Sequence, residues 1–156
     1  MRQDSRLSRL LHVLLHMHGR DTPLTSETIA AMLGSNPAVV RRTMAGLREA
    51  GYVRSEKGHG GGWTLNRSLS EITLLDVYRA LGHAELFAFG LSNEDPSCLV
   101  EQAVNSAMRK TLLEAEQLML QRFGEVTLAD LAADFAKRRA SHPHCDSDHA
   151  GLVGSH

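Results

Sequence analysis

The chain has 156 residues and a formal net charge of −1, and 42% of its residues are hydrophobic. This length suits one domain, or one domain with an appendage, and no apolar run reaches the roughly 18–20 residues of a membrane span. The charge is divided unevenly: residues 1–67 carry ten Arg/Lys and five Asp/Glu (net +5), and residues 68–156 carry seven and thirteen (net −6). We therefore expect the first half to meet a polyanion.

The first residues, MRQDSRLSRL, lack the apolar core and small-residue cleavage site of a signal peptide. The two cysteines, Cys98 and Cys145, are far apart in the sequence, and the second lies in a polar tail. We therefore expect no structural disulfide, no membrane partner and a reducing, cytoplasmic setting.

Three helices are predicted in the first 50 residues. Leucines at helical spacing predict the first over residues 5–18, and Gly19 ends it. Thr25 or Ser26 caps the second, which ends at Gly34. The third follows SNP, with Asn36 as its N-cap and Pro37 as its first residue. Two short helices joined around Gly34 are typical of a helix-turn-helix.

The third helix has the character of a recognition helix. Val40, Met44 and Leu47 form one apolar face, and small and basic residues lie on the other side. Small residues allow close approach to a major groove, and arginines reach bases or phosphates. The predicted DNA-contacting residues of this segment are Asn36, Ala38, Arg41, Arg42, Ala45 and Arg48. An ordinary amphipathic helix with solvated arginines fits the same pattern equally well.

The stretch EKGHGGGWTL, residues 56–65, lies between two β-prone segments, YVRS (52–55) and WTLN (63–66). It therefore predicts a hairpin with a glycine-rich tip, which after a helix-turn-helix would be a wing. Lys57, Gly58, His59 and Gly60 are the predicted contacts of this wing with DNA, and Trp63 is expected to anchor it on the core. A nucleotide-binding loop is disfavoured because the run lacks the GxxxxGK[ST] spacing and precedes a strand.

The second half is predicted to hold a short helix at 73–81, a linker at 83–97, a long helix at about 98–121, a final helix at 127–139 and a disordered tail at 140–156. Thr73 and Asp76 have the spacing of a capping box. The long helix carries an apolar stripe formed by Val100, Val104, Met108, Ala115 and Leu118. About 24 residues span roughly 36 Å. A stripe of this length is expected to pair with a second copy of the chain.

These segments resemble the Rrf-two family of winged-helix bacterial regulators, which includes IscR, NsrR and CymR. The resemblance is carried by SNPAVVRRTMAGLREAGYV (35–53), GHGGGWTL (58–65) and ITLLDVYRALG (72–82), and it extends to about residue 138. Within this family, the chain most resembles the YwnA-type branch. The resemblance implies a mainly α fold: a winged helix-turn-helix domain at 1–82 with a two-stranded wing, and a long C-terminal dimerisation helix within 98–139.

The same resemblance implies a homodimer that binds double-stranded DNA at a near-palindromic operator and usually represses transcription. Iron–sulfur members of the family carry three closely spaced cysteines near the start of the dimerisation helix. This chain has only Cys98 there, so no iron–sulfur cluster or other cofactor is expected.

Two other segments carry candidate sites, one around Cys98 and one in the tail. Asp95 or Ser97 could cap the long helix, which would place Cys98 in the first turn, where unpaired N–H groups favour a reactive thiolate. A redox-sensing thiol is one interpretation, and a packing residue at the dimer interface is the other. The tail residues His142, His144, Cys145 and His149 are weak candidates for a metal site because their spacing fits no standard motif.

His12 and His16 are spaced for a metal but are more typical of an exposed helix surface. No catalytic motif is present, so an enzyme is not expected. The predicted function is a transcriptional regulator that binds DNA. The alternatives are a winged-helix module that binds protein and a metal-responsive regulator that uses the tail.

Overall fold

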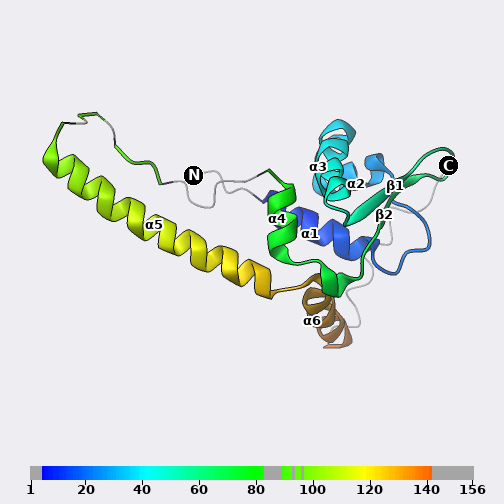
Figure 1. The fold of residues 1–156 in the computed structure, drawn as a ribbon. Coiled ribbons are helices and arrows are strands. Elements are labelled where there is room, and N and C mark those ends of the chain that lie inside the picture. Colours follow the sequence, from blue (N-terminus) through cyan, green and yellow to red (C-terminus); the bar gives the residue numbers. More distant parts are fainter. Residues whose placement is uncertain (1–4, 83–88, 93, 96, 142–156) are drawn as a thin grey trace.

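The computed structural model describes residues 5–82, 89–92, 94, 95 and 97–141. Its elements in chain order are α1 (Arg6–Met17), α2 (Ser26–Leu33), α3 (Pro37–Glu49), β1 (Val53–Glu56), β2 (Gly62–Leu65), the 3₁₀ turn η1 (Leu69–Glu71), α4 (Leu74–Ala80), α5 (Leu99–Glu125) and α6 (Leu128–Ser141). The short elements gather into one body, and α5 projects from it as a single long arm (Figure 1).

The helix-turn-helix is built by local capping, as predicted. The Thr25 side chain accepts a hydrogen bond from the Thr28 backbone N–H and begins α2. Gly34 ends that helix in the left-handed conformation at φ 59°, which glycine adopts without the steric cost of a Cβ. The Asn36 side chain then accepts from the Val39 backbone N–H at 3.0 Å and begins α3.

The predicted hairpin is confirmed. β1 and β2 pair antiparallel in the register Val53↔Leu65 to Glu56↔Gly62. Each strand is shifted by one residue from its predicted bounds. The hairpin also pairs with the segment before α2, because Leu24 and Trp63 exchange backbone hydrogen bonds of 3.0 and 2.8 Å.

The core lies where α1, α2, α3, α4, α6 and the hairpin meet. Leu10, Val13 and Leu14 of α1 are buried in it, as is the predicted apolar face of α3 formed by Val40, Met44 and Leu47. Burial of an aliphatic side chain contributes about 1.5–3 kcal/mol. The face of α3 that these residues define is therefore fixed against the body.

α4 has the predicted capping box. The Asp76 carboxylate accepts from the Thr73 backbone N–H at 2.9 Å, and the Asp76 N–H donates to the Thr73 hydroxyl at 3.2 Å. A second capping box, formed by Ser68 and Glu71, begins η1, which was not predicted. α3 packs closely on the end of α4: a Cβ placed on Gly46 would lie 2.7 Å from the carbonyl oxygen of Ala80.

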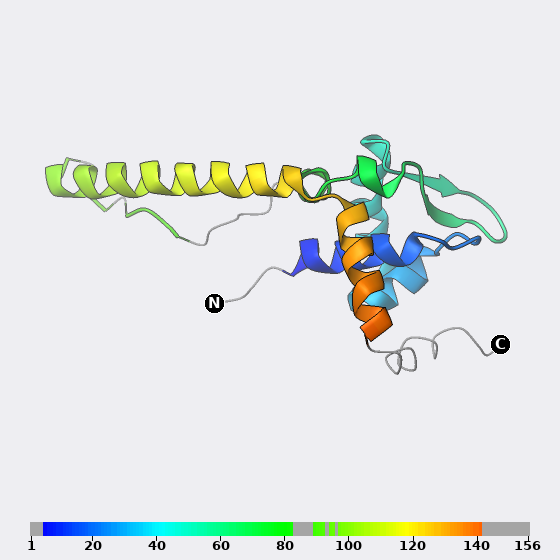
Figure 2. The ribbon, with the colours of Figure 1, turned by 90° about the horizontal axis from the view of Figure 1, so that it is seen from below.

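α5 is longer than predicted, with 27 residues instead of about 24, and none of them is buried. Its C-terminal end packs against α4, and the rest of the helix extends away from the body (Figures 1 and 2).

α6 returns to the body after α5. Leu128 is fully buried in the core, and its backbone N–H donates to the Ile72 carbonyl at 2.8 Å. The helix continues to Ser141, which corrects the predicted start of a disordered tail at residue 140. The rest of that tail, residues 142–156, lies outside the described residues.

Candidate nucleic-acid interface

The outer face of α3 is solvent-exposed over most of its length. Asn36, Ala38, Arg41, Arg42 and Arg48 are exposed, and Ala45 is half-buried. Ala38, Arg42 and Ala45 lie roughly opposite the buried face of α3, and Arg41 and Arg48 lie on one flank of it. This arrangement has the form of a recognition helix, and the individual contacts with DNA stay predictions.

Two arginines of this face have different settings. Arg41 donates to the Glu27 carboxylate of α2 at 3.2 Å, with both side chains exposed. An exposed pair of this kind contributes at most about 1 kcal/mol, so a phosphate can replace the carboxylate at small cost. Arg42 lies about 160° around the helix from Met44 and faces solvent directly.

Val39 was not among the predicted contacts. It is an exposed large hydrophobic residue on the first turn of α3, with 43% of its surface accessible. An apolar side chain on a recognition helix can contact the methyl group of thymine. The sequence signal for it was weak, because Val39 falls off both the buried face and the basic face of the helix.

The tip of the wing is exposed from Lys57 to Gly60, the four predicted contacts. Gly58 and Gly60 have φ of 93° and 77°, in the region that favours glycine. A Cβ on either of these two glycines would have no atom within 4 Å, so the space beside both is open. A backbone without side chains can approach phosphate closely.

Trp63 fixes the wing relative to the helix-turn-helix. Its side chain is 7% exposed, and its indole Nε1–H donates to the Ser26 hydroxyl at 3.0 Å. The predicted anchoring role of Trp63 is therefore confirmed. Gly62 is required beside it, since a Cβ there would lie 2.5 Å from the Leu24 carbonyl oxygen.

The predicted apolar stripe of α5 faces solvent in the single chain. Val100, Val104, Met108 and Leu118 are 72, 51, 37 and 56% exposed, and Ala115 is half-buried. At 100° per residue these five side chains fall within about 80° of one another on the helix. Such a row is an unpartnered apolar surface in the single chain.

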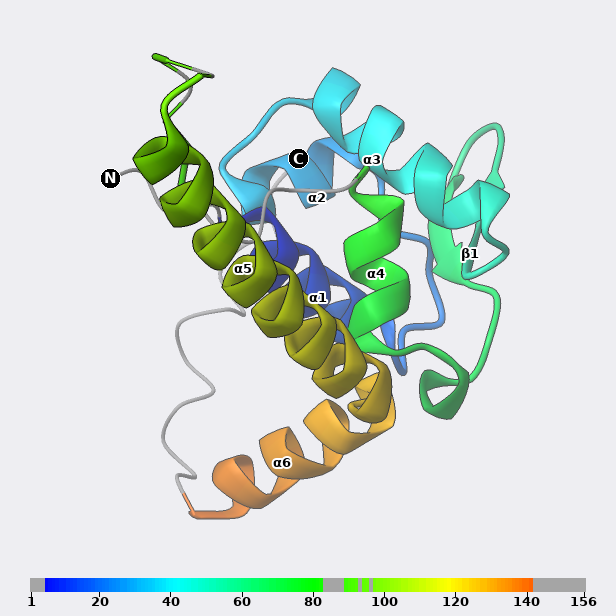
Figure 3. The same ribbon diagram turned by 60° about the vertical axis from the view of Figure 1, so that its left-hand side comes forward.

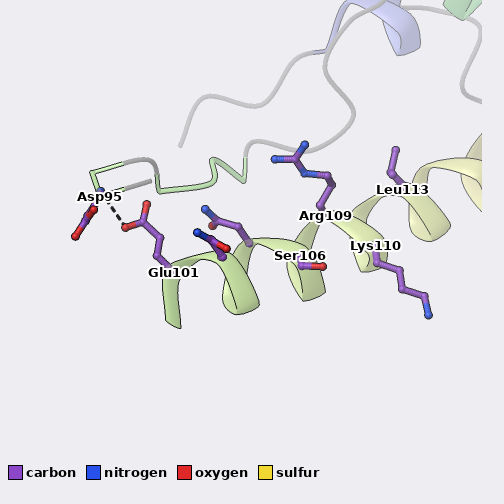
Figure 4. Close-up of a pocket in the computed structure, with 8 residues that line it drawn as sticks. Asp95, Glu101, Ser106, Arg109, Lys110 and Leu113 are labelled. Atoms are coloured by element: carbon purple, nitrogen blue, oxygen red, sulfur yellow. Dashed lines mark hydrogen bonds between the residues drawn. The ribbon is translucent and has the colours of Figure 1, made fainter. Parts of the chain in front are cut away.

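A second face of α5 is covered by the chain itself. At its C-terminal end Phe123 meets Tyr78 of α4, with ring centroids 6.1 Å apart. At its N-terminal end Asn105 donates to the Ser92 carbonyl at 2.6 Å. The Asp95 backbone N–H donates to Glu101 at 3.1 Å (Figure 4). The exposed stripe is therefore distinct from the face that α5 uses within the chain.

Asp95 and one face of α5 from Glu101 to Leu113 line an open hollow of about 540 Å³ (Figure 4). It carries charges of both signs, from Asp95, Glu101, Arg109 and Lys110. Within the described part of the chain, Glu101 Oε1 is the one buried side-chain oxygen or nitrogen without a hydrogen-bond partner.

Cys98 was predicted in the first turn of α5. It is instead the N-cap of this helix, one position earlier. The capping roles predicted for Asp95 and Ser97 fail because these two residues bond to each other: the Ser97 N–H and hydroxyl both donate to the Asp95 carboxylate. The Asp95 backbone carbonyl accepts the Cys98 N–H at 3.0 Å. Cys98 is half-buried and free, at the start of the exposed stripe.

The described residues include one of the thiols that an iron–sulfur cluster would need, Cys98. Such a cluster is held by about four ligands, most of them thiolates. The chain has two cysteines. Among the described residues no group of three or more His, Cys, Asp and Glu side chains could hold a metal ion. The tail candidates His142, His144, Cys145 and His149 lie outside the described residues. Among the residues that the structure describes, no helix is long and apolar enough to cross a membrane.

Comparison with known proteins places this geometry in a family. The Rrf2 family model, described as an iron-dependent transcriptional regulator, matches residues 3–134. YwnA of Bacillus subtilis (strain 168), named as an HTH-type transcriptional regulator, is 33% identical over 129 residues, which are 82% of this chain and 95% of YwnA.

Two solved structures are similar in fold. IscR from T. potens has a TM-score of 0.60 and 22% identity, over 86% of this chain and 88% of IscR. CymR, the global cysteine regulator of B. subtilis, has a TM-score of 0.58 and 25% identity, over 85% of this chain and 98% of CymR. The chain belongs to the Rrf2 (Rrf-two) family and is a winged-helix, DNA-binding transcriptional regulator, not an enzyme.

Proposed function

We propose that the chain acts as a homodimeric repressor that binds a near-palindromic operator in the cytoplasm, where it meets chromosomal DNA, and that it does so without an iron–sulfur cluster. The observation that supports this most strongly is the apolar stripe of α5, which the single chain leaves exposed on an arm that leaves the body. A second copy offers the same stripe, so the surface is complementary to itself.

The dimer would present two copies of α3 and the wing. Two half-sites are engaged together only when their recognition helices lie about one DNA turn apart, roughly 34–36 Å. We infer that α5 sets this separation, and that a signal acting on residues 89–98 or on α5 alters it.

The dimer is tested by polar replacement on the stripe. The double variant Val104→Gln/Met108→Gln should be monomeric at low micromolar concentration by light scattering, because it removes the middle of the apolar row. Leu113→Gln is the matched control: Leu113 is 51% exposed but lies on the opposite face of α5. A double variant that stays dimeric would show that this surface is not the interface.

The operator is tested by footprinting the purified protein on its own upstream region. Protection of two related half-sites about one turn apart is expected, with affinity that falls steeply as salt is raised, because phosphate contacts release counterions. Absence of protection, with salt-insensitive capture of a protein partner, would favour the alternative of a protein-binding winged helix.

We further propose that oxidants act on the regulator through Cys98. Cys98 is the half-buried N-cap of α5, two residues before Val100 of the stripe, so a bulky or charged adduct would disturb the start of that stripe. Peroxide or a disulfide-forming reagent should release wild type and Cys145→Ser from the operator but leave Cys98→Ser bound. If Cys98→Ser is released as readily as wild type, or if wild type ignores oxidants, Cys98 is a packing residue.

A further inference from the structure

The outer face of α1 carries two histidines that the DNA-binding surfaces do not use. His12 is exposed and His16 is half-buried. They lie one turn apart on the side of the helix opposite the buried Leu10 and Leu14. Neither belongs to the helix-turn-helix, the wing or the stripe of α5.

The structure brings the same atom of each ring together. The two Nε2 atoms are 2.8 Å apart, and the ring centroids are 4.5 Å apart with the planes at 65°. Imidazole nitrogens bind late transition metals at about 2.0–2.1 Å. Two such ligands at 90° on one metal are then separated by about 2.9 Å, and two at the tetrahedral angle by about 3.4 Å.

We propose that His12 and His16 together bind a divalent late transition-metal ion through their Nε2 atoms. The separation favours the 90° angle of Cu²⁺ or Ni²⁺ over tetrahedral Zn²⁺, because Zn²⁺ would need the rings to part by about half an ångström. The Irving–Williams order gives the same preference for Cu²⁺ over Zn²⁺.

Metal binding to this pair requires a change of tautomer but no net loss of a proton. In the metal-free pair, one Nε2 carries the hydrogen that the other accepts. Metal binding needs both Nε2 lone pairs, so that proton leaves Nε2 and Nδ1 carries the hydrogen in both neutral rings. The bound metal would link two consecutive turns of α1, which is also tied to α2 by the Arg9 guanidinium, a donor to the Leu33 carbonyl at 2.8 Å. The metal should therefore stabilise the folded chain.

The test uses the full chain at a pH of about 7.5. Ni²⁺ is titrated calorimetrically into wild type, His12→Ala, His16→Ala and the control His18→Ala, which alters an exposed histidine outside the pair. All four are made in a background with His142, His144 and His149 changed to alanine, which removes three tail ligands. Broadening of backbone amide NMR signals by Cu²⁺ then shows where the metal lies.

We expect wild type and His18→Ala to bind Ni²⁺ alike, with a rise in melting temperature, and both pair variants to lose that binding and that rise. Cu²⁺ should broaden signals of residues 9–19 in wild type and not in His12→Ala. Equal Ni²⁺ binding by wild type and both pair variants would overturn the proposal, as would loss of binding in His18→Ala or broadening that avoids α1. Since His12 and His16 lie away from the core, circular dichroism should show the same helix content in all four.

Discussion

Replacing Gly46 with alanine tests how tightly the recognition helix is held. Gly46 lies inside α3, where alanine is favoured over glycine by about 1 kcal/mol. A Cβ there, however, would lie 2.7 Å from the carbonyl oxygen of Ala80, which is a backbone atom that cannot rotate away. The helix propensity and the contact therefore act in opposite directions.

The contact should prevail. To reach an ordinary separation of about 3.4 Å, α3 and the end of α4 must part by about 0.7 Å, and overpacking of this kind costs about 1–3 kcal/mol. Subtracting the gain in helix propensity leaves a net loss of about 1 kcal/mol, or about 2–4 °C in melting temperature. Specific DNA affinity should fall as well, because α3 moves relative to the wing.

Gly124→Ala is the matched control. This glycine lies in the last turn of α5, and its Cβ would meet Leu75 Cδ2 at 3.5 Å, an ordinary contact. Gly124→Ala should therefore raise the melting temperature and leave DNA binding unchanged. Both variants are measured by thermal unfolding and by mobility shift on the footprinted operator. If Gly46→Ala is stabilised as much as Gly124→Ala, the α3–α4 contact accommodates the added methyl group and does not position the recognition helix.

Three further predictions concern other parts of the chain. Arg42→Ala should weaken operator binding in a mobility-shift assay with little change in melting temperature, since Arg42 lies off the buried face; unchanged affinity would remove it from the contacts. Leu128→Ala should lower the free energy of unfolding in urea by about 2–5 kcal/mol, because Leu128 is fully buried. Phe135→Ala, on the same helix and 58% exposed, should cost much less, and equal losses would contradict the packing of α6 on the body. Burial raises the pKa of Asp76, but hydrogen bonds from Thr73 and Tyr52 outweigh burial and lower that pKa below 3.8. The ionised carboxylate therefore stabilises the fold at neutral pH, and this stabilisation is lost as the pH falls below about 4. Urea midpoints of Asp76→Asn should lack this part of the acid loss, and identical pH profiles would disprove it.

The parts of the fold that depend on neighbouring residues could be predicted from the sequence. Asn36 followed by Pro37 marks the start of α3, and the Thr73–Asp76 pair marks the start of α4, because a cap forms within one turn. The glycine-rich tip predicts a hairpin for the same reason. Each of these features requires only a few consecutive residues.

Contacts between distant residues could not be predicted in this way. Nothing near Leu128 in the sequence indicates that its N–H bonds to Ile72, or that Thr127 pairs with Thr73, so α6 was expected only as a final helix. The position of Cys98 was missed by one residue because the Asp95 side chain bonds to Ser97 instead of capping α5. The convergence of His12 and His16 depends on side-chain rotamers, which spacing alone does not fix.

The short helix α4 connects the arm to the recognition helix. It lies between α5 and α3 (Figure 3). On one side Leu74 donates its backbone N–H to Val126 at 3.0 Å, and Tyr78 meets Phe123. On the other side Ala80 leaves no room for a side chain on Gly46. Because dense packing transmits strain, we expect a change at α5 that shifts α4 to shift α3 as well. The surface that would set the distance between two subunits and the surface that would read DNA are therefore linked through one helix of seven residues.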